Sequence, residues 1–356
     1  MKILHAADLH LDTPFTGRTE AEAHFLRQEL LKIPQRLRQI CVQEGCDLVL
    51  LAGDLFDGSW TMESLDALHR SLEEMAVPVF ISPGNHDFCG PDSPYLTEEW
   101  PDNVHIFTKP QISAVEVPAL DLKVYGAGYD AMDCPPLLEG FRAEGAQKYH
   151  VGLLHADPIQ KGSPYCPVTM AQVQESGLDY LALGHVHQGG LFRADETLCA
   201  WPGCPMGRGF DETEGKGALI VALSTIADAR LVSLDGPRFY DLQVEVGEDP
   251  AAAIRRVLPP LGHEDFYRIT LTGETEPLDI PALRQGFQQF PYLELRDRTV
   301  PVLDVWGALD EDTLEGMYLR TLKQAMSDAS TQDREALELV ARISKLILEG
   351  REVALP

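Results

Sequence analysis

Residues that bind divalent metal ions recur in the first two thirds of the chain, each time close behind a short apolar stretch. Carboxylate and amide oxygens together with imidazole nitrogens suit Mn²⁺, Fe²⁺ or Zn²⁺ better than Cu(I) or an iron–sulfur cluster. One carboxylate in such a set can bridge two ions roughly 3.5 to 4 Å apart, so that the ions clamp the attacking and leaving oxygens of a phosphoester. The candidate ligands are Asp8, His10, Asp54, Asn85, His155, His185 and His187, behind the stretches 3–4, 48–52, 77–81, 151–154 and 180–183.

The spacing of these ligands allows them to converge. In extended backbone, residues i and i+2 point to the same side, so Asp8 can meet His10 and His185 can meet His187. Glycines stand beside the ligands at positions 53, 84 and 184, where the missing side chain lets the backbone turn sharply and approach a metal or phosphate. One Asp-x-His pair is usually structural, but several such segments, each closing an apolar stretch, predict one joint site.

The elements that must position this site follow an α/β pattern. Short apolar stretches, typical of strands, alternate with amphipathic stretches, which indicates a layered α/β domain rather than a bundle. The segment 34–44 is predicted to be a helix that begins with a proline and ends before Gly45, and 64–75 is predicted to be a second helix. Sites in open α/β sheets lie at the carboxyl ends of the strands, where the candidate ligands stand.

The pattern changes after about residue 240. Strands are predicted at 241–246, 266–272 and 293–298, and helices at 250–257 and 283–290. We therefore predict a catalytic domain at 1–238, a small α/β capping domain at 239–300 and a helical segment at 301–356.

Two helical patterns occupy this last segment. The second has Ser330 and Asp333 spaced as a capping box and Gly350 as a stop, with apolar residues on one face at 336, 339, 340, 343, 346 and 347. The two helices either form a hairpin that packs on its own domain or offer a docking surface to a partner.

The charge of the chain limits what it can bind unaided. Its 29 Lys and Arg face 56 Asp and Glu, a net charge of −27, while 44% hydrophobic residues are ordinary for a globular protein. Such a surface repels DNA, RNA and anionic lipid at long range. A polyanionic substrate would need a local patch, a metal centre or a partner.

The cysteines and the amino terminus favour a cytoplasmic protein. The 7 cysteines are odd in number and include no C-x-x-C pair, so we expect reduced thiols. The first residues lack the apolar segment of a signal peptide, and no stretch approaches the roughly 20 apolar residues of a membrane span.

The motifs resemble those of a known family. The chain is similar to the calcineurin-like metallophosphoesterases, within them to the SbcD-type DNA repair exonucleases, and closest to the YhaO-like bacterial branch in the segment 8–15 and the terminal helices. The segments that carry the resemblance are Asp8-Leu9-His10, Gly53-Asp54-Leu55-Phe56-Asp57, Gly84-Asn85-His86-Asp87, His155 and Gly184-His185-Val186-His187.

The resemblance implies a four-layer α-β-β-α sandwich with a capping domain, a carboxyl-terminal segment that docks an SbcC-type coiled-coil ATPase, and a symmetric dimer. It also implies two divalent ions, with Mn²⁺ expected and Fe²⁺, Zn²⁺ or Mg²⁺ as alternatives. One ion would be held by Asp8, His10, Asp54 and His187, and the other by Asp54, Asn85, His155 and His185.

Further residues are assigned roles around this centre. His86 is the candidate general acid, because it directly follows a ligand, and Asp87 is expected to orient its imidazole. Asp57 and Asp12 are weaker candidates for acceptors that hold ligand histidines. The cations that could contact substrate phosphate are Arg18, Lys161, Arg193, Arg208 and Lys216.

Three functions remain open at this point. The first is a DNA exonuclease or endonuclease that acts in DNA repair with an SbcC-like ATPase. The second is a phosphoesterase for a nucleotide or another small phosphoester. Phosphoprotein phosphatases of this superfamily usually carry Arg and Glu where this chain has Gly58 and Asp87, which favours the nuclease over a protein phosphatase. The third is a mainly structural subunit of an ATPase complex.

Overall fold

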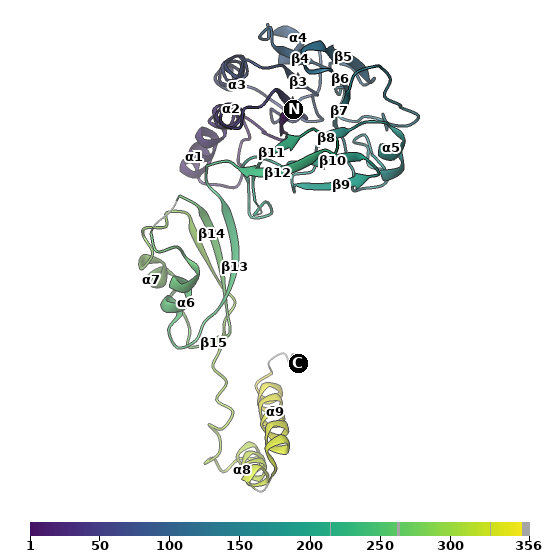
Figure 1. Cartoon of the computed structure of the whole chain (residues 1–356). Coiled ribbons are helices and arrows are strands. Elements are labelled where there is room, and N and C mark those ends of the chain that lie inside the picture. The colour runs from purple at the N-terminus through teal and green to yellow at the C-terminus, as the bar shows by residue number, and fades with distance from the viewer. Residues whose placement is uncertain (214, 262–263, 328, 351–356) are drawn as a thin grey trace. The chain divides into compact units, whose positions relative to one another are not determined.

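The computed structural model describes residues 1–213, 215–261, 264–327 and 329–350, and the chain divides into two compact units, Met1–Tyr240 and Asp241–Pro356 (Figure 1). The first unit contains two six-stranded sheets. One sheet has the order β12-β11-β1-β2-β3-β4, formed by Asp228–Ser233, Gly217–Ala222, Lys2–Ala6, Leu48–Leu51, Val79–Ile81 and Val104–Ile106. The other has the order β5-β6-β7-β8-β10-β9, formed by Ser113–Val117, Leu122–Gly126, Tyr149–His155, Tyr180–Gly184, Thr197–Trp201 and Gly190–Ala194.

The main core lies between the two sheets. Leu50 and Phe80 from the first sheet belong to one buried cluster with Val151 and Tyr180 from the second. Strands β1 to β4 run parallel, as do β6, β7 and β8. Because parallel neighbours share a direction, the carboxyl ends of β1, β2 and β3 meet at one edge, and those of β7 and β8 meet at another.

Helices form the outer layers. On the side of the first sheet lie α1 (Glu20–Leu30), α2 (Ile33–Glu44) and α3 (Met62–Met75) (Figure 1), whereas α5 (Met170–Glu175) packs on the second sheet through Val173. Two short helices, α4 (Pro94–Thr97) and η1 (Pro118–Leu120), lie in connecting segments. Gly45 ends α2 in the left-handed conformation, at φ 63°. These layers confirm the predicted α/β sandwich.

Strand β13 (Phe239–Glu245) crosses from the first unit into the second. In the sheet of the second unit, β13 is followed by β14 (Phe266–Thr272) and β16 (Leu293–Asp297), while β15 (Glu274–Thr275) pairs with β17 (Val300–Pro301). Its helices are α6 (Pro250–Val257), α7 (Ile280–Gln285), α8 (Leu314–Ser327) and α9 (Thr331–Leu348). The helix predicted at 283–290 is wrong in its bounds, because Asp279 caps α7 by accepting a hydrogen bond from the Ala282 amide. The helix therefore begins and ends earlier.

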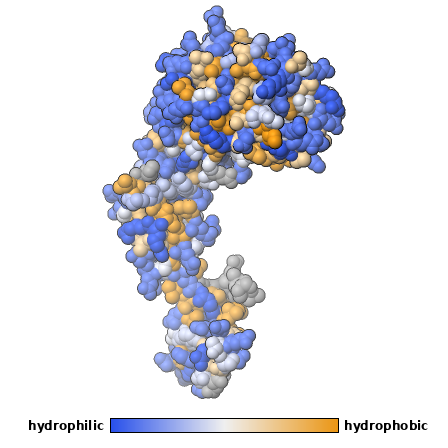
Figure 2. Space-filling view, viewed as in Figure 1, coloured by the Kyte–Doolittle hydropathy of each residue, from blue (hydrophilic) through white to orange (hydrophobic). Residues whose placement is uncertain are grey.

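Helices α8 and α9 form a hairpin. Ser330 caps α9 by accepting from the Asp333 amide, as its spacing predicted. The Tyr318 hydroxyl lies 2.8 Å from the Ser344 hydroxyl, which joins the two helices. Apolar side chains remain at the hairpin surface (Figure 2), including Leu314, which is 84% exposed. Among the described residues, no helix is long and apolar enough to cross a membrane.

Candidate metal centre

The segments that follow β1 and β2 run side by side and carry three candidate ligands. The Asp8 amide donates to the Gly53 carbonyl and the His10 amide to the Asp54 carbonyl, both at 2.9 Å. Asp8, His10 and Asp54 have φ angles of 53°, 46° and 51°, which cost free energy in residues other than glycine. The extended geometry expected between Asp8 and His10 is therefore wrong. Left-handed turns, fixed by pairing between the two segments, aim these side chains.

Both candidate carboxylates have one oxygen bound to backbone and the other turned toward histidines. Asp8 Oδ1 accepts from the His185 amide at 3.0 Å, and Asp54 Oδ1 accepts from the His86 amide at 2.9 Å. Asp8 Oδ2 is buried and has no hydrogen-bond partner within the described chain. A buried carboxylate oxygen without a partner is costly, and a cation beside it would remove that cost.

The first group of donors combines Asp8 with His10 and His187, whose ligand atoms all lie within 4.8 Å of one another. The Nε2 atoms of His10 and His187 approach to 3.1 Å. Two imidazole nitrogens and a carboxylate oxygen at these separations fit a divalent ion.

The second group surrounds the Asn85 side chain. Asn85 Oδ1 lies 3.0 Å from His155 Nε2 and 3.2 Å from His185 Nδ1. Asp54 Oδ2 lies between the two groups, 3.4 Å from His155 Nε2 and 3.8 Å from His10 Nε2. The structure thus brings all seven predicted ligands together, with Asp54 at the junction.

Three histidines are held on their Nδ1 side, so that Nε2 faces the centre. The partner of His155 Nδ1 is the Ala52 carbonyl at 2.8 Å, that of His187 is Glu212 Oε1 at 2.8 Å, and that of His10 is Asp57 Oδ1 at 3.3 Å. Histidines that bind metals almost always have such a partner on the second nitrogen. Glu212 was missed by the sequence reasoning, because nothing in its neighbourhood marks it as a partner of His187.

Close packing explains the glycines beside the ligands. A Cβ on Gly84 would lie 2.8 Å from the His155 ring and overlap the Asp54 carboxylate. A Cβ on Gly53, where φ is +87°, would lie 2.5 Å from His155 Nδ1. Any side chain at these positions would displace candidate ligands.

The pKa values of the Asp8 and Asp54 carboxyl groups are shifted in opposite directions. Burial raises the pKa of Asp8. Burial acts in the same direction on Asp54, but the neighbouring His155 and His10 outweigh it and hold the pKa of Asp54 below its usual value. In the cluster, the histidines thus outweigh burial at Asp54, whereas burial outweighs them at Asp8. This contrast again fits a cation next to Asp8.

His86 stands at the edge of the centre and pairs with Asp57. Its Nδ1 lies 2.9 Å from Asp57 Oδ1, and its side chain is 43% exposed. The hydrogen bond to Asp57 raises the pKa of His86. Its ring centroid lies 4.9 Å from that of His10. An exposed imidazole that is readily protonated beside the ligands is suited to deliver a proton.

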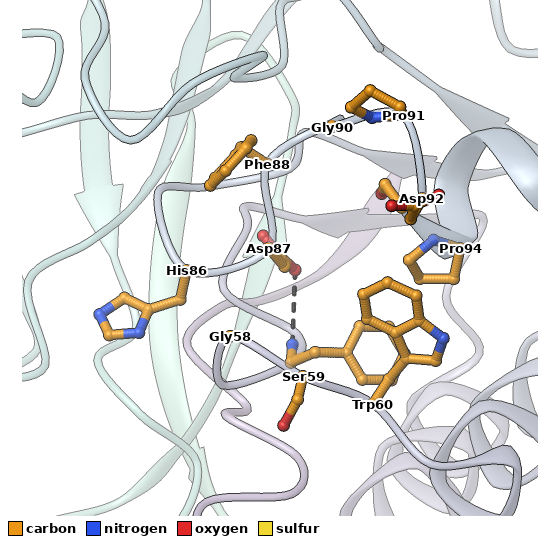
Figure 3. A pocket seen from close by; sticks show the side chains of 12 residues that line it. Gly58, Ser59, Trp60, His86, Asp87, Phe88, Gly90, Pro91, Asp92 and Pro94 are labelled. Atoms are coloured by element: carbon orange, nitrogen blue, oxygen red, sulfur yellow. Dashed lines mark hydrogen bonds between the residues drawn. The ribbon is translucent and has the colours of Figure 1, made fainter.

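The role predicted for Asp87 as the partner of the His86 imidazole is wrong. Its carboxylate accepts from the Tyr95 hydroxyl at 2.6 Å and from the amides of Leu55 and Gly84 at 2.7 Å. Figure 3 shows the His86 and Asp87 side chains pointing in different directions. Asp87 is buried and joins the backbones of two motif segments, whereas Asp57 holds His86.

The remaining candidates divide between the centre and other places. Arg208 donates to Glu212 Oε1 at 3.1 Å and lies 2.8 Å from His187 Nδ1, while the Lys216 ammonium donates to the His187 carbonyl at 3.1 Å. The others are placed as follows: Asp12 accepts from Thr61 and Ser64 at the start of α3, Arg18 lies 5.1 Å from the Phe210 and Phe239 rings, Arg193 donates to the Ala227 carbonyl at 2.5 Å, and Lys161 is exposed.

Residues 1–189 match the family described as Calcineurin-like phosphoesterase. The chain belongs to this family. This calcineurin-like chain is 33% identical over 241 residues to the uncharacterized metallophosphoesterase YhaO of Bacillus subtilis (strain 168), an alignment that covers 62% of this chain and 57% of YhaO.

Two further relatives carry more specific names. The SbcD component of the nuclease SbcCD of Staphylococcus epidermidis is 28% identical over 123 residues, which cover 33% of this chain and 31% of the relative. The DNA double-strand break repair protein Mre11 of Sulfurisphaera tokodaii is 25% identical over 374 residues, which cover 96% and 93%. The chain thus matches between about a third and just over half of the length of the first two relatives.

Proposed function

We propose that this chain hydrolyses phosphodiesters at a centre that holds two divalent ions. The ligands are assigned as Asp8, His10, Asp54 and His187 for one ion, and Asp54, Asn85, His155 and His185 for the other. The observation that carries the proposal is the position of Asp54 Oδ2 between two groups of donors, next to the unpartnered Asp8 Oδ2.

The donor set favours Mn²⁺, with Fe²⁺, Zn²⁺ or Mg²⁺ as alternatives, because it combines oxygens and imidazoles without a thiolate. When bound, two such ions supply a nucleophilic hydroxide and neutralise charge on the phosphoryl oxygens. Asp57, Glu212 and the Ala52 carbonyl keep the three histidines turned toward the ions.

We assign to His86 the protonation of the leaving oxygen. Asp57 occupies its Nδ1 and raises its pKa, so His86 carries a proton on Nε2 at neutral pH more often than a free imidazole. General-acid catalysis by a positioned side chain contributes about 10²- to 10⁴-fold. Asp87 has no part in this step, since its carboxylate is engaged by backbone amides and by Tyr95.

We assign to Arg208 a hydrogen bond to a phosphoryl oxygen of the substrate. Its guanidinium is held by Glu212 next to His187, while its buried Nε has no hydrogen-bond partner within the described chain. The Arg208 side chain is 19% exposed, so its guanidinium, next to the candidate ligands, is available to donate to an anion.

DNA is the proposed substrate. Support comes from the names of two relatives, one a nuclease subunit and the other a DNA double-strand break repair protein, and from Gly58, which stands where phosphoprotein phosphatases usually have Arg. The net charge of −27 opposes binding of DNA to the surface as a whole. We therefore assign part of the DNA contact to an SbcC-like ATPase.

The test measures hydrolysis of linear DNA and of bis-p-nitrophenyl phosphate by the wild type, Asp54→Asn and His86→Ala, with Mn²⁺, Mg²⁺ or chelator in one buffer. Both variants should lose activity, and only Asp54→Asn should also lose bound metal in calorimetric titrations. Turnover of the small diester with DNA untouched would assign the centre to another phosphoester. Absence of metal-dependent turnover on both substrates would contradict the proposal.

The α8–α9 hairpin is the proposed docking surface for the ATPase. Between its helices lies a cavity of about 670 Å³ lined by Leu314, Tyr318, Ile347 and Leu348. The double variant Leu314→Asp/Ile347→Asp should abolish copurification with a coexpressed SbcC-like ATPase. Ile226→Asp, at a 66% exposed position in the first unit, should not. If the double variant also lost hydrolysis of the small diester, the hairpin would not be a docking surface alone but would also be needed for catalysis.

A further inference from the structure

A small pocket adjoins the proposed metal centre and shares one residue with it. The pocket has a volume of about 250 Å³ and is lined by Phe56 and by residues of the segments 58–60 and 86–94. His86 lies at its edge (Figure 3), so the pocket begins at the residue that we assign to the leaving oxygen. We call this cavity the Trp60 pocket.

The walls of the Trp60 pocket are largely aromatic or apolar. In Figure 3, Phe88 and Trp60 lie on opposite sides of the view with Asp87 between them, and Pro91 and Pro94 extend the wall. Both aromatic side chains are partly exposed, although each follows one of the motif segments of the centre. Nucleobases stack on partly exposed aromatic rings in many proteins that bind single strands, largely irrespective of the base.

The volume of the Trp60 pocket and the charge of its lining residues favour a single neutral ring system as its ligand. A volume of about 250 Å³ lies below the roughly 300–1,000 Å³ of pockets for drug-sized ligands, so it suits one ring system. No lysine or arginine belongs to the described residues that line it, whereas Asp87 and Asp92 do. A phosphate is therefore disfavoured. The exposed Asp92 can accept hydrogen bonds from the amino group of a base such as cytosine.

We propose that the Trp60 pocket binds the nucleobase of the nucleoside that leaves with the oxygen protonated by His86. This inference rests on the proposed function, because it places the scissile phosphate at the metal centre. The leaving nucleoside is bonded to the oxygen that faces His86, so its base lies on the His86 side of the phosphate. Trp60 and Phe88 are thus assigned to stack on that base, and Asp92 to its amino group.

The kinetic test uses three dinucleotides in Mn²⁺: one with two cytosines, and two in which one or the other cytosine is replaced by hydrogen. Trp60→Ala should raise KM about tenfold for the intact dinucleotide and for the abasic dinucleotide that retains the base assigned to the pocket. For the abasic dinucleotide that lacks this base, the KM of Trp60→Ala should match that of the wild type. Trp60→Phe should retain most of the affinity, because its ring still stacks.

Trp306→Ala, which removes a tryptophan of the second unit, is the matched control and should leave KM unchanged on all three substrates. The same increase of KM for Trp60→Ala on all three dinucleotides would assign Trp60 to folding rather than to the base. No increase on the intact dinucleotide would also overturn the inference.

A binding measurement separates this inference from the proposed function. If the wild type cleaves no dinucleotide, the proposed activity fails on that substrate, and calorimetric titration with deoxycytidine in EDTA becomes decisive. Trp60→Ala should weaken that binding about tenfold, and Asp92→Asn should abolish a preference for deoxycytidine over thymidine. Equal affinities of the wild type and Trp60→Ala would overturn the pocket assignment, and an unchanged preference would overturn the role of Asp92.

Discussion

The candidate metal centre and the α8–α9 hairpin depart from the usual pattern of burial in opposite directions. Asp8 and His10 are 0% exposed and Asp54 is 1% exposed, whereas Leu314 is 84% and Ile347 is 63% exposed. Burial of polar groups costs free energy unless hydrogen bonds offset it, and exposure of apolar groups forgoes the hydrophobic contribution. Neither arrangement is what folding alone favours. Buried ligands indicate a site that binds ions, and exposed apolar residues indicate a surface that binds a partner.

The two regions also differ in how firmly their side chains are held. In the centre, Asp8 and Asp54 each bind a backbone amide, and three histidines have a partner on Nδ1. In the hairpin, the side-chain contacts between the helices include the Tyr318–Ser344 hydrogen bond and the Lys345–Glu315 ion pair. A change in the centre should therefore alter function and stability together, whereas a change on the hairpin surface should alter binding alone.

The largest effect among the residues around the ligands is expected for Glu212→Gln. The charged carboxylate lies 2.8 Å from His187 Nδ1, and loss of its charge should lower the affinity for Mn²⁺ about 10- to 100-fold. Isothermal titration calorimetry of the chelated protein measures this affinity. Asp211→Asn makes the same chemical change at the neighbouring exposed position and should have no effect. If both variants behaved alike, Glu212 would not orient His187.

An effect of similar size, but on stability, is expected for Asp87→Asn. The amide would replace a carboxylate that accepts from the Leu55 and Gly84 amides and from Tyr95, so the free energy of unfolding should fall by about 1–3 kcal/mol. Urea unfolding measures this loss. The control is Asp12→Ala, which removes acceptors from Thr61 and Ser64 at the start of α3 and should cost about 1 kcal/mol. If the Asp87→Asn protein were as stable as the wild type but inactive, Asp87 would have a role in catalysis.

The smallest effect on stability is expected on the hairpin. Because Leu314 is 84% exposed, Leu314→Asp should change the free energy of unfolding by no more than about 0.5 kcal/mol. Leu319→Asp, at a buried position of the same helix, should destabilise the protein strongly. If Leu314→Asp proved as destabilising, Leu314 would belong to a core, and the contrast between the two regions would disappear.

Local patterns predicted much of the first unit. Helices α2 and α3 were found within about two residues of their bounds, because Gly45 and the apolar spacing act over a few neighbours. The parallel strands that precede the ligands were also found, since buried strands are continuous apolar runs. Helix α1, strand β11 and the edge strand β12 were missed. Four of the six β12 positions are exposed, which weakens the apolar pattern of a strand.

The sequence by itself determined the ligand types, their order and the strand ends at which they stand, because these follow from residue identity and local hydrophobicity. Only the tertiary structure decided the pairing of side chains: Asp57 with His86, Asp87 with the backbone of the motif segments, and Glu212 with His187. The left-handed backbone at Asp8 and Asp54 was likewise decided by pairing between the segments after β1 and β2. Such contacts join residues far apart in the chain, and their geometry depends on how the strands and loops pack rather than on any local pattern.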